Sequence, residues 1–110
     1  MSDRIHDLNN LLKEDPDDPF LYYALGLEHH REGHKNMALV MFNLIIRKFP
    51  DYLPVYYQAA RLQVEMGDFE LAKTTFKAGI AQAEKTSDNK TLLEMKDAYN
   101  NFLVEQREDQ

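Results

Sequence analysis

The sequence contains no cysteine, so the chain can form neither a disulfide nor a thiolate metal site. It also lacks any apolar run near the ~20 residues that a membrane-spanning helix needs. Residues 1–7 have neither the basic start nor the apolar stretch of a secretory signal. From these absences we expect no membrane association, and we take the cytoplasm as the expected location.

An excess of positive charge is absent as well, because the formal net charge is −6. This charge lies at the two ends: residues 1–18 carry −4 and residues 105–110 carry −2, whereas residues 19–104 sum to zero. No basic stripe is present that could contact a series of phosphates. The charge distribution therefore argues against a nucleic-acid partner.

The motifs of catalysis are missing too. The sequence has no glycine-rich phosphate loop, no nucleophile elbow and no Ser/His/Asp arrangement. Asp17 and Asp18 precede a predicted helix, where paired carboxylates act as caps. His30 and His34 have the i, i+4 spacing of metal ligands, but Gly33 is expected to end the helix between them and a third ligand is missing. We predict no enzyme activity, no metal and no cofactor.

What the sequence does contain is an internal repeat. When the chain is aligned with itself at an offset of 34 residues, eight of 34 positions are identical, where chance would give about two. The matches are aromatic, small and turn-forming residues, the types needed for packing and chain reversal. The identical pairs are Pro16/Pro50, Asp17/Asp51, Tyr22/Tyr56, Tyr23/Tyr57, Gly33/Gly67, Ala38/Ala72, Phe42/Phe76 and Ile46/Ile80.

Each repeated unit shows two helical stretches of apolar residues at i, i+3/i+4 and i+7. These stretches are 21–29 and 37–49 in the first unit, and 55–66 and 71–80 in the second. Gly33 and Gly67 follow the first helix of each unit, where the chain must reverse through a left-handed conformation. Pro50 stops the second helix of the first unit.

Two further helices flank the repeats. Ile5, Leu8, Leu11 and Leu12 share one face of a predicted helix at 3–14. Ser87 or Asp88 can cap a last helix whose apolar face covers the second unit, as a solenoid requires. We therefore predict one all-α domain of six antiparallel helices over residues 1–110. Its parts are a helix at 3–14, repeats at 19–52 and 53–86, and a capping helix at 88–107, which carries Leu92, Met95, Tyr99, Phe102 and Leu103.

The repeat resembles the tetratricopeptide repeat (TPR) family. The first unit carries the family pattern at Tyr22, Leu25, Gly26, Gly33, Ala38, Phe42 and Pro50, and the second at Tyr56, Ala59, Ala60, Gly67, Ala72 and Phe76. The resemblance implies helical hairpins stacked as a short right-handed α-solenoid. His29 and Gln63 replace the aromatic residue that is usual late in the first helix. The second unit has Glu84 in place of the closing proline and Gly79 where the first has Ile45, which leaves the docking angle of the last helix open.

Members of this family bind peptides or partner helices in a concave groove, so the resemblance implies a protein-interaction adaptor. The residues that would face the groove lie off the packing stripe of the first helices and on the last helix. The candidates are Phe20, Tyr23, Leu27, His30, Arg31, Tyr57, Arg61, Val64, Met95 and Tyr99. Their aromatic and apolar character is typical of an interaction surface. In the alternative interpretation, a terminal helix covers Tyr23, Leu27 and Tyr57, which are then core residues.

Two functional hypotheses follow for this face. In the first it binds a peptide or helix of another protein, and in the second it forms a symmetric homodimer. TPR domains that hold a chaperone's C-terminal carboxylate use a cluster of lysine, asparagine and arginine. Of the matching positions here, which are Tyr23, Leu27, Tyr57, Arg61, Thr91 and Met95, only Arg61 could contribute. A carboxylate clamp is therefore not expected.

Overall fold

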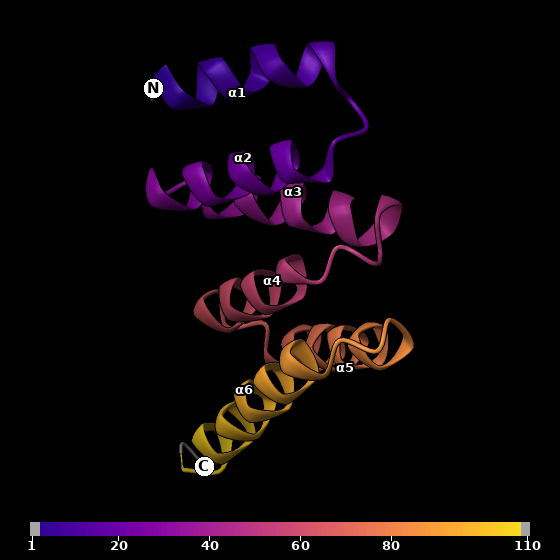
Figure 1. Cartoon of the computed structure of the whole chain (residues 1–110). Coiled ribbons are helices and arrows are strands. Elements are labelled where there is room, and N and C mark those ends of the chain that lie inside the picture. Colours follow the sequence, from indigo (N-terminus) through magenta and orange to yellow (C-terminus); the bar gives the residue numbers. More distant parts are fainter. Residues whose placement is uncertain (1–2, 109–110) are drawn as a thin grey trace. The chain divides into compact units, whose positions relative to one another are not determined.

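The computed structural model describes residues 3–108 and contains six α-helices and no strand over that range. The helices are α1 (Asp3–Glu14), α2 (Pro19–Arg31), α3 (Lys35–Lys48), α4 (Pro54–Glu65), α5 (Phe69–Lys85) and α6 (Asn89–Glu108) (Figure 1). The predicted all-α class and the helix at 3–14 are confirmed. None of these helices has the length and apolar character needed to span a bilayer.

The chain divides into two compact units at the Val55–Tyr56 bond, within the first turn of α4. The first unit holds α1, α2 and α3, and the second holds α5, α6 and almost all of α4. We describe each unit by itself. The expectations of one domain over 1–110 and of a right-handed stack remain predictions.

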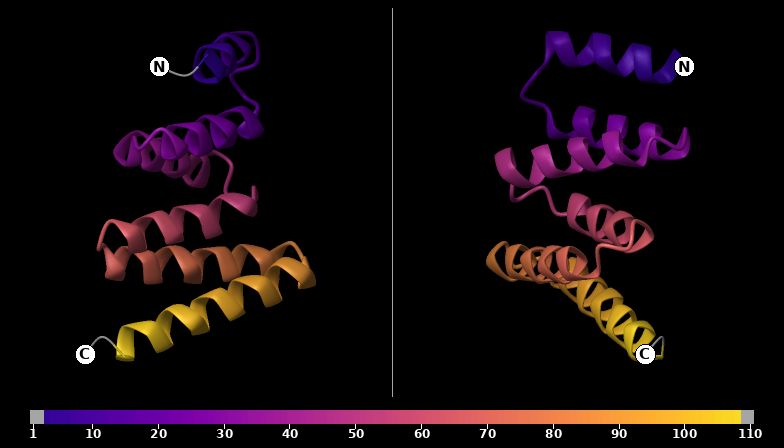
Figure 2. Two further views of the ribbon diagram at one scale, coloured as in Figure 1. Left: turned by 90° about the vertical axis from the view of Figure 1, so that its left-hand side faces the viewer. Right: turned by 180° about the vertical axis from the view of Figure 1, so that it is seen from behind.

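In the first unit, α2 contacts both α1 and α3 (Figure 2). Pro19 occupies the start of α2, where a missing N–H costs nothing, and the Asp18 carboxylate accepts a hydrogen bond of 2.9 Å from the Phe20 N–H. The predicted capping role is thus confirmed for Asp18. Ile5 and Leu8 of α1 are buried against the apolar face of α2, which contributes Leu21, Ala24 and Leu25.

The contact between α2 and α3 depends on a residue without a side chain. A Cβ atom at Gly26 would overlap the Phe42 ring, with Phe42 Cδ1 only 2.8 Å away. Phe42 and Ala38 on α3 are almost completely buried. The Leu-Gly pair of the family pattern therefore provides the space in which the Phe42 ring packs against the α2 backbone.

The second unit has its close approach at a different place. A Cβ atom at Gly79 on α5 would lie 2.7 Å from Met95 Cε on α6 and 2.7 Å from Tyr56 Cβ on α4. Side chains from both neighbouring helices thus contact the α5 backbone at one point. The absence of a side chain at Gly79 thus lets α6 pack closely on α5.

Three helix ends reverse through a left-handed residue. Gly33 and Gly67 have φ of 85° and 81°, as predicted from their positions, and Ser87 takes the same role with φ of 58°. After each turn a backbone N–H donates to the carbonyl five residues earlier, at 2.8 Å for His34 to His29 and 2.9 Å for Asp68 to Gln63. These bonds satisfy carbonyls that the helix ends leave free.

Ser87 and Asp88 were alternative caps for α6, and the structure assigns them different roles. Ser87 forms the turn, while the Asp88 carboxylate accepts a 3.0 Å hydrogen bond from the Thr91 N–H. The hydrogen bonds from the Thr91 backbone and hydroxyl lower the pKa of Asp88. Asp88 is therefore the cap that holds the first turn of α6.

His29 and Gln63, which replace the aromatic residue usual late in the first helix of each repeat, contact different partners. Gln63 is only 4% exposed, and its Oε1 accepts a 2.7 Å hydrogen bond from the Thr75 hydroxyl on α5. In the first unit the position of Thr75 is taken by Met41, which has no hydroxyl. His29 lies instead beside His34, with 3.3 Å between their Nδ1 atoms. Burial, and then the nearby His34, lower the pKa of His29.

Ala38 and Ala72 are both fully buried where α3 and α5 pack on their neighbours. We expect Ala38→Leu and Ala72→Leu each to lower the free energy of unfolding by about 1–3 kcal/mol, because the added methylenes have no space. Urea denaturation measures the effect. Ala81→Leu, at an exposed position of the same α5 helix, is the matched control. Equal stability of all three variants would show that the helix faces are assigned wrongly.

Gly79→Ala tests the close approach of α4 and α6 to α5. Alanine favours a helix interior by about 1 kcal/mol over glycine, so a gain in stability is expected if space is available. We expect a loss instead, since the new Cβ would lie 2.7 Å from Tyr56 and Met95. Ala81→Gly on the exposed side of α5 calibrates the propensity difference. A higher melting temperature for Gly79→Ala would contradict the packing described above.

Removal of residues 88–110 is expected to destabilise the second unit or to make the protein aggregate. Met95 and Phe102 are buried, and without α6 their partners on α5 would face water. Thermal melting and light scattering check this expectation. Removal of residues 107–110 alone, which leaves both residues in place, is the control. A shortened chain as stable and monomeric as the control would mean that α6 covers nothing essential.

Candidate functional site

The second unit contains an open pocket of about 430 Å³ between α4 and α6, with α5 at its base. Three of its lining residues, Tyr57, Arg61 and Val64, are predicted site residues. The full lining consists of Tyr57, Arg61, Val64 and Glu65 from α4, Phe76 from α5, and Ala98, Asn101, Phe102 and Glu105 from α6.

Tyr57 and Arg61 form one side of this pocket and contact each other. They are one helical turn apart, and the Arg61 guanidinium carbon lies 5.5 Å from the centre of the Tyr57 ring, within cation–π range. Tyr57 is 38% exposed, and Arg61 is exposed. The packing positions predicted for α4 are all buried, namely Tyr56, Ala59, Ala60 and Gln63. The predicted outward orientation of Tyr57 and Arg61 is therefore correct.

The interior of the pocket is aromatic and its rim is polar. Phe76 and Phe102 are buried with 5.5 Å between ring centres, and Tyr99 packs against both. Glu65, Asn101 and Glu105 are exposed around this aromatic base. Such an arrangement can take up an apolar side chain and hold the polar groups next to it.

The candidate residues of the first unit differ from one another in exposure. Phe20 is 55% exposed, and Leu27 is also exposed. Tyr23 is half-buried, with its ring centre 6.1 Å from that of Phe42 and 5.5 Å from that of Tyr52. Burial, and then the neighbouring Tyr23, raise the pKa of Tyr52. Tyr23 thus contributes to packing within its own unit while part of its ring stays accessible.

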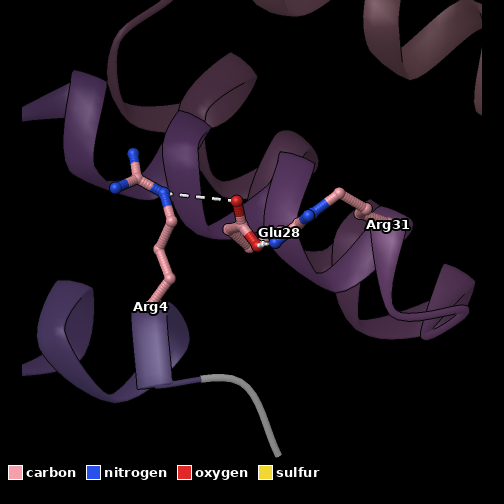
Figure 3. A network of polar contacts seen from close by, with 3 residues as sticks. All are labelled: Arg4, Glu28 and Arg31. Atoms are coloured by element: carbon pink, nitrogen blue, oxygen red, sulfur yellow. Dashed lines mark hydrogen bonds and ion pairs between the residues drawn. The ribbon is translucent and has the colours of Figure 1, made fainter.

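Arg31 belongs to a local ion-pair network. Its guanidinium donates to the Glu28 carboxylate at 2.7 Å, and Arg4 of α1 contacts the other Glu28 oxygen at 3.2 Å (Figure 3). Glu28 is largely buried, whereas both arginines are exposed. The network connects α1 to α2, so Arg31 has a structural task in addition to its place on the candidate face. His30, its neighbour, is half-buried.

The two candidates on α6 lie deeper than expected. Met95 is only 3% exposed and its Cε approaches Gly79, so it is a core residue of the second unit. The expectation that Met95 faces the groove was wrong, because α6 packs closely on α5 at this glycine, whereas its expected place on the apolar face that covers the second unit is confirmed. Tyr99 is half-buried, with its ring centre 5.6 Å from that of Phe76.

Sequence reasoning missed two residues of α6 that line the pocket, Asn101 and Glu105. Together with Ala98, which the sequence does place on the groove side of this helix, they form one stripe at i, i+3 and i+7. Phe76 and Phe102 were assigned to packing, and they do pack, but part of each also reaches the pocket. In the described range, no three histidine, aspartate or glutamate residues cluster closely enough to hold a metal ion.

The sequence profile of the tetratricopeptide repeat matches residues 53–86, which span α4 and α5. Among curated proteins, none matches this chain. Among solved structures, the TPR2B domain of yeast Sti1, in a complex with pHsp70, has a TM-score of 0.82 at 17% identity, covering 92% of this chain and 81% of that one. At this identity the likeness shows a shared fold.

Two other solved structures are more similar in sequence, and both are of a tetratricopeptide repeat domain protein from Salinibacter ruber. The solution NMR structure is 33% identical with a TM-score of 0.76, covering 80% of this chain and 89% of that one. The crystal structure is 31% identical with a TM-score of 0.74, covering 80% of this chain and 98% of that one. Together with the repeat pattern and the helical hairpins, these matches show that the chain belongs to the tetratricopeptide repeat family.

Proposed function

We propose that this protein is a binding module that takes up a peptide or helix of a partner protein at the pocket of the second unit. The observation that carries the proposal is the Tyr57–Arg61 stack beside an aromatic base. Tyrosine and arginine are the residue types most enriched, with tryptophan, at binding hot spots. In this chain they are held side by side at the surface.

The shape and composition of the pocket support a segment with one apolar side chain. Its volume of about 430 Å³ falls within the range of pockets that hold small organic groups. The ring of Phe102 would contact an inserted aliphatic or aromatic group, and Asn101 would offer hydrogen bonds to the adjacent backbone. Catalysis has no place in this proposal, because the pocket would act through contact alone.

The charge around the pocket favours a partner without a terminal carboxylate at this point. Arg61 is the sole base among its lining residues, whereas Glu65 and Glu105 are acids. A carboxylate bound there would meet two like charges and one opposite charge. The pHsp70 complex named for yeast Sti1 supports protein partners for the fold in general.

Tyr57→Ala combined with Arg61→Ala is expected to weaken partner binding by about 2 kcal/mol or more, about thirtyfold in Kd. The fold should remain, since both side chains are accessible and the packing positions of α4 are untouched. The measurement uses peptides selected from a display library on the wild-type protein, titrated by fluorescence anisotropy against wild type and variant. Circular dichroism confirms that the variant is folded.

Val40→Ala combined with Arg47→Ala is the matched control. It removes one apolar residue and one arginine from exposed positions of α3, outside the pocket. Equal loss of affinity in both double variants, or none in the first, would place the site elsewhere. A wild-type dimer that the Tyr57/Arg61 variant converts to a monomer, measured by light scattering, would support the homodimer hypothesis instead.

A further inference from the structure

The pocket side of α6 carries two exposed glutamates on one stripe of the helix. Ala98, Asn101 and Glu105 line the pocket at i, i+3 and i+7. Glu94 lies one turn before Ala98 and continues the stripe past the pocket, and both glutamates are exposed. The helical rise places Glu94 and Glu105 about 16 Å apart along the helix axis. A segment bound along this side of α6 would therefore meet a carboxylate at each end of the stripe.

The bases of α6 do not neutralise this stripe. Lys96 and Arg107 are each two residues away from one of the two glutamates, which places them on the opposite side of the helix. Lys90 precedes Glu94 by one turn, at the end of the stripe farther from the pocket. In the part of the chain that the structure describes, neither Glu94 nor Glu105 forms an ion pair. Both carboxylates are thus available to a positive charge of a partner.

The two sides of the pocket differ in charge. On the α4 side, the Arg61 guanidinium lies against the Tyr57 ring, with 5.5 Å from its carbon to the ring centre. On the α6 side, the residues that line the pocket include the acid Glu105 and no base. Unequal charge on the two sides of a site fixes the orientation of a bound segment and excludes partners with the wrong charge. A positive charge next to the inserted group is therefore attracted toward α6.

Asn101 indicates the backbone form of the bound segment. It is exposed between Ala98 and Glu105, and its amide offers both a donor and an acceptor. The backbone groups of a helix are paired within the helix, whereas an extended segment leaves them free to bond with this amide. An extended chain rises about 3.3 Å per residue, so it covers the distance from Glu105 to Glu94 in about five residues.

We propose that the pocket selects a basic, extended segment of a partner protein. An aliphatic or aromatic residue of the segment enters the pocket, and a neighbouring lysine or arginine pairs with Glu105. A second base about five residues away pairs with Glu94. This inference rests on the proposed function and adds to it the chemistry of the partner, because the proposed function alone requires no charge on the bound segment.

Peptide selection followed by removal of the two charges tests the proposal. Random peptides of about twelve residues, long enough to reach both glutamates, are selected by phage display on the full-length protein and then synthesised. We expect them to carry lysine or arginine beside an apolar residue. Glu94→Gln combined with Glu105→Gln should weaken their binding by about threefold to tenfold at low salt, as two exposed ion pairs allow. Fluorescence anisotropy measures Kd, and circular dichroism confirms the fold.

Glu70→Gln combined with Glu84→Gln is the matched control, since it removes two exposed glutamates of α5 that lie outside the pocket. It should keep the wild-type Kd. Raising NaCl from about 50 mM to about 500 mM should weaken binding to the wild type more than to the Glu94/Glu105 variant, because salt screens exposed pairs. Replacing the bases of the peptide by glutamine should cost little further affinity once both glutamates are removed.

The outcomes separate this inference from the proposed function. Peptides that lose affinity for the Tyr57/Arg61 variant but carry no excess of bases would overturn the inference and leave the proposed function standing. Equal Kd values in the Glu94/Glu105 and Glu70/Glu84 variants would do the same. Absence of any selected peptide, or peptides that bind the Tyr57/Arg61 variant as tightly as the wild type, would overturn both.

Discussion

Packing of side chains against bare helix backbone is the constraint on which both units depend. At Gly26 the space of a missing Cβ is filled by the Phe42 ring, and at Gly79 it is filled by Tyr56 and Met95 together. A side chain at either glycine would separate the helices and remove the contacts of the buried residues around them. The two units use the device at different helices: Gly26 lies in the first helix of its hairpin and Gly79 in the second.

The sequence predicts the helices more completely than the pocket, because the signals for helices are local and the contacts that form the pocket are not. Apolar spacing, Gly33, Gly67 and Pro50 mark where helices run and end, because these signals act within a few residues along the chain. The pocket depends on how α6 packs across α5, which is set by contacts with Gly79 from distant residues. Tyr57, Arg61 and Val64 lie on α4 and could be identified from its packing stripe alone. Met95 matched both the packing face and the groove in the sequence, and only the close approach of α6 to α5 decides between them.

The two substituted aromatic positions show a second limit of sequence reasoning. His29 and Gln63 both follow the packing stripe, yet each is polar and needs a partner. The Gln63 partner is Thr75, twelve residues away on the next helix, and the His29 neighbour is His34, across a turn. Helical spacing by itself would pair His34 with His30. The backbone hydrogen bond from the His34 N–H to the His29 carbonyl instead brings His34 beside His29. The periodic pattern therefore places residues 29 and 63 on the packing stripe, but it does not identify the residues that they contact.

The order of contacts also bears on how the protein folds. In the first unit α1 packs on α2 and α2 on α3, and in the second α5 packs on α6, so helices that follow each other along the chain are partners in space. Closing the short turns between such partners costs little chain entropy, and proteins rich in local contacts fold in microseconds to milliseconds. Helix α1 has a neighbour on one side only within its unit, and it is held by Ile5, Leu8 and the Arg4–Glu28 pair. Opening of α1 exposes little more than this small contact, so its amides should exchange with solvent earlier than those of α2, which is held on two sides.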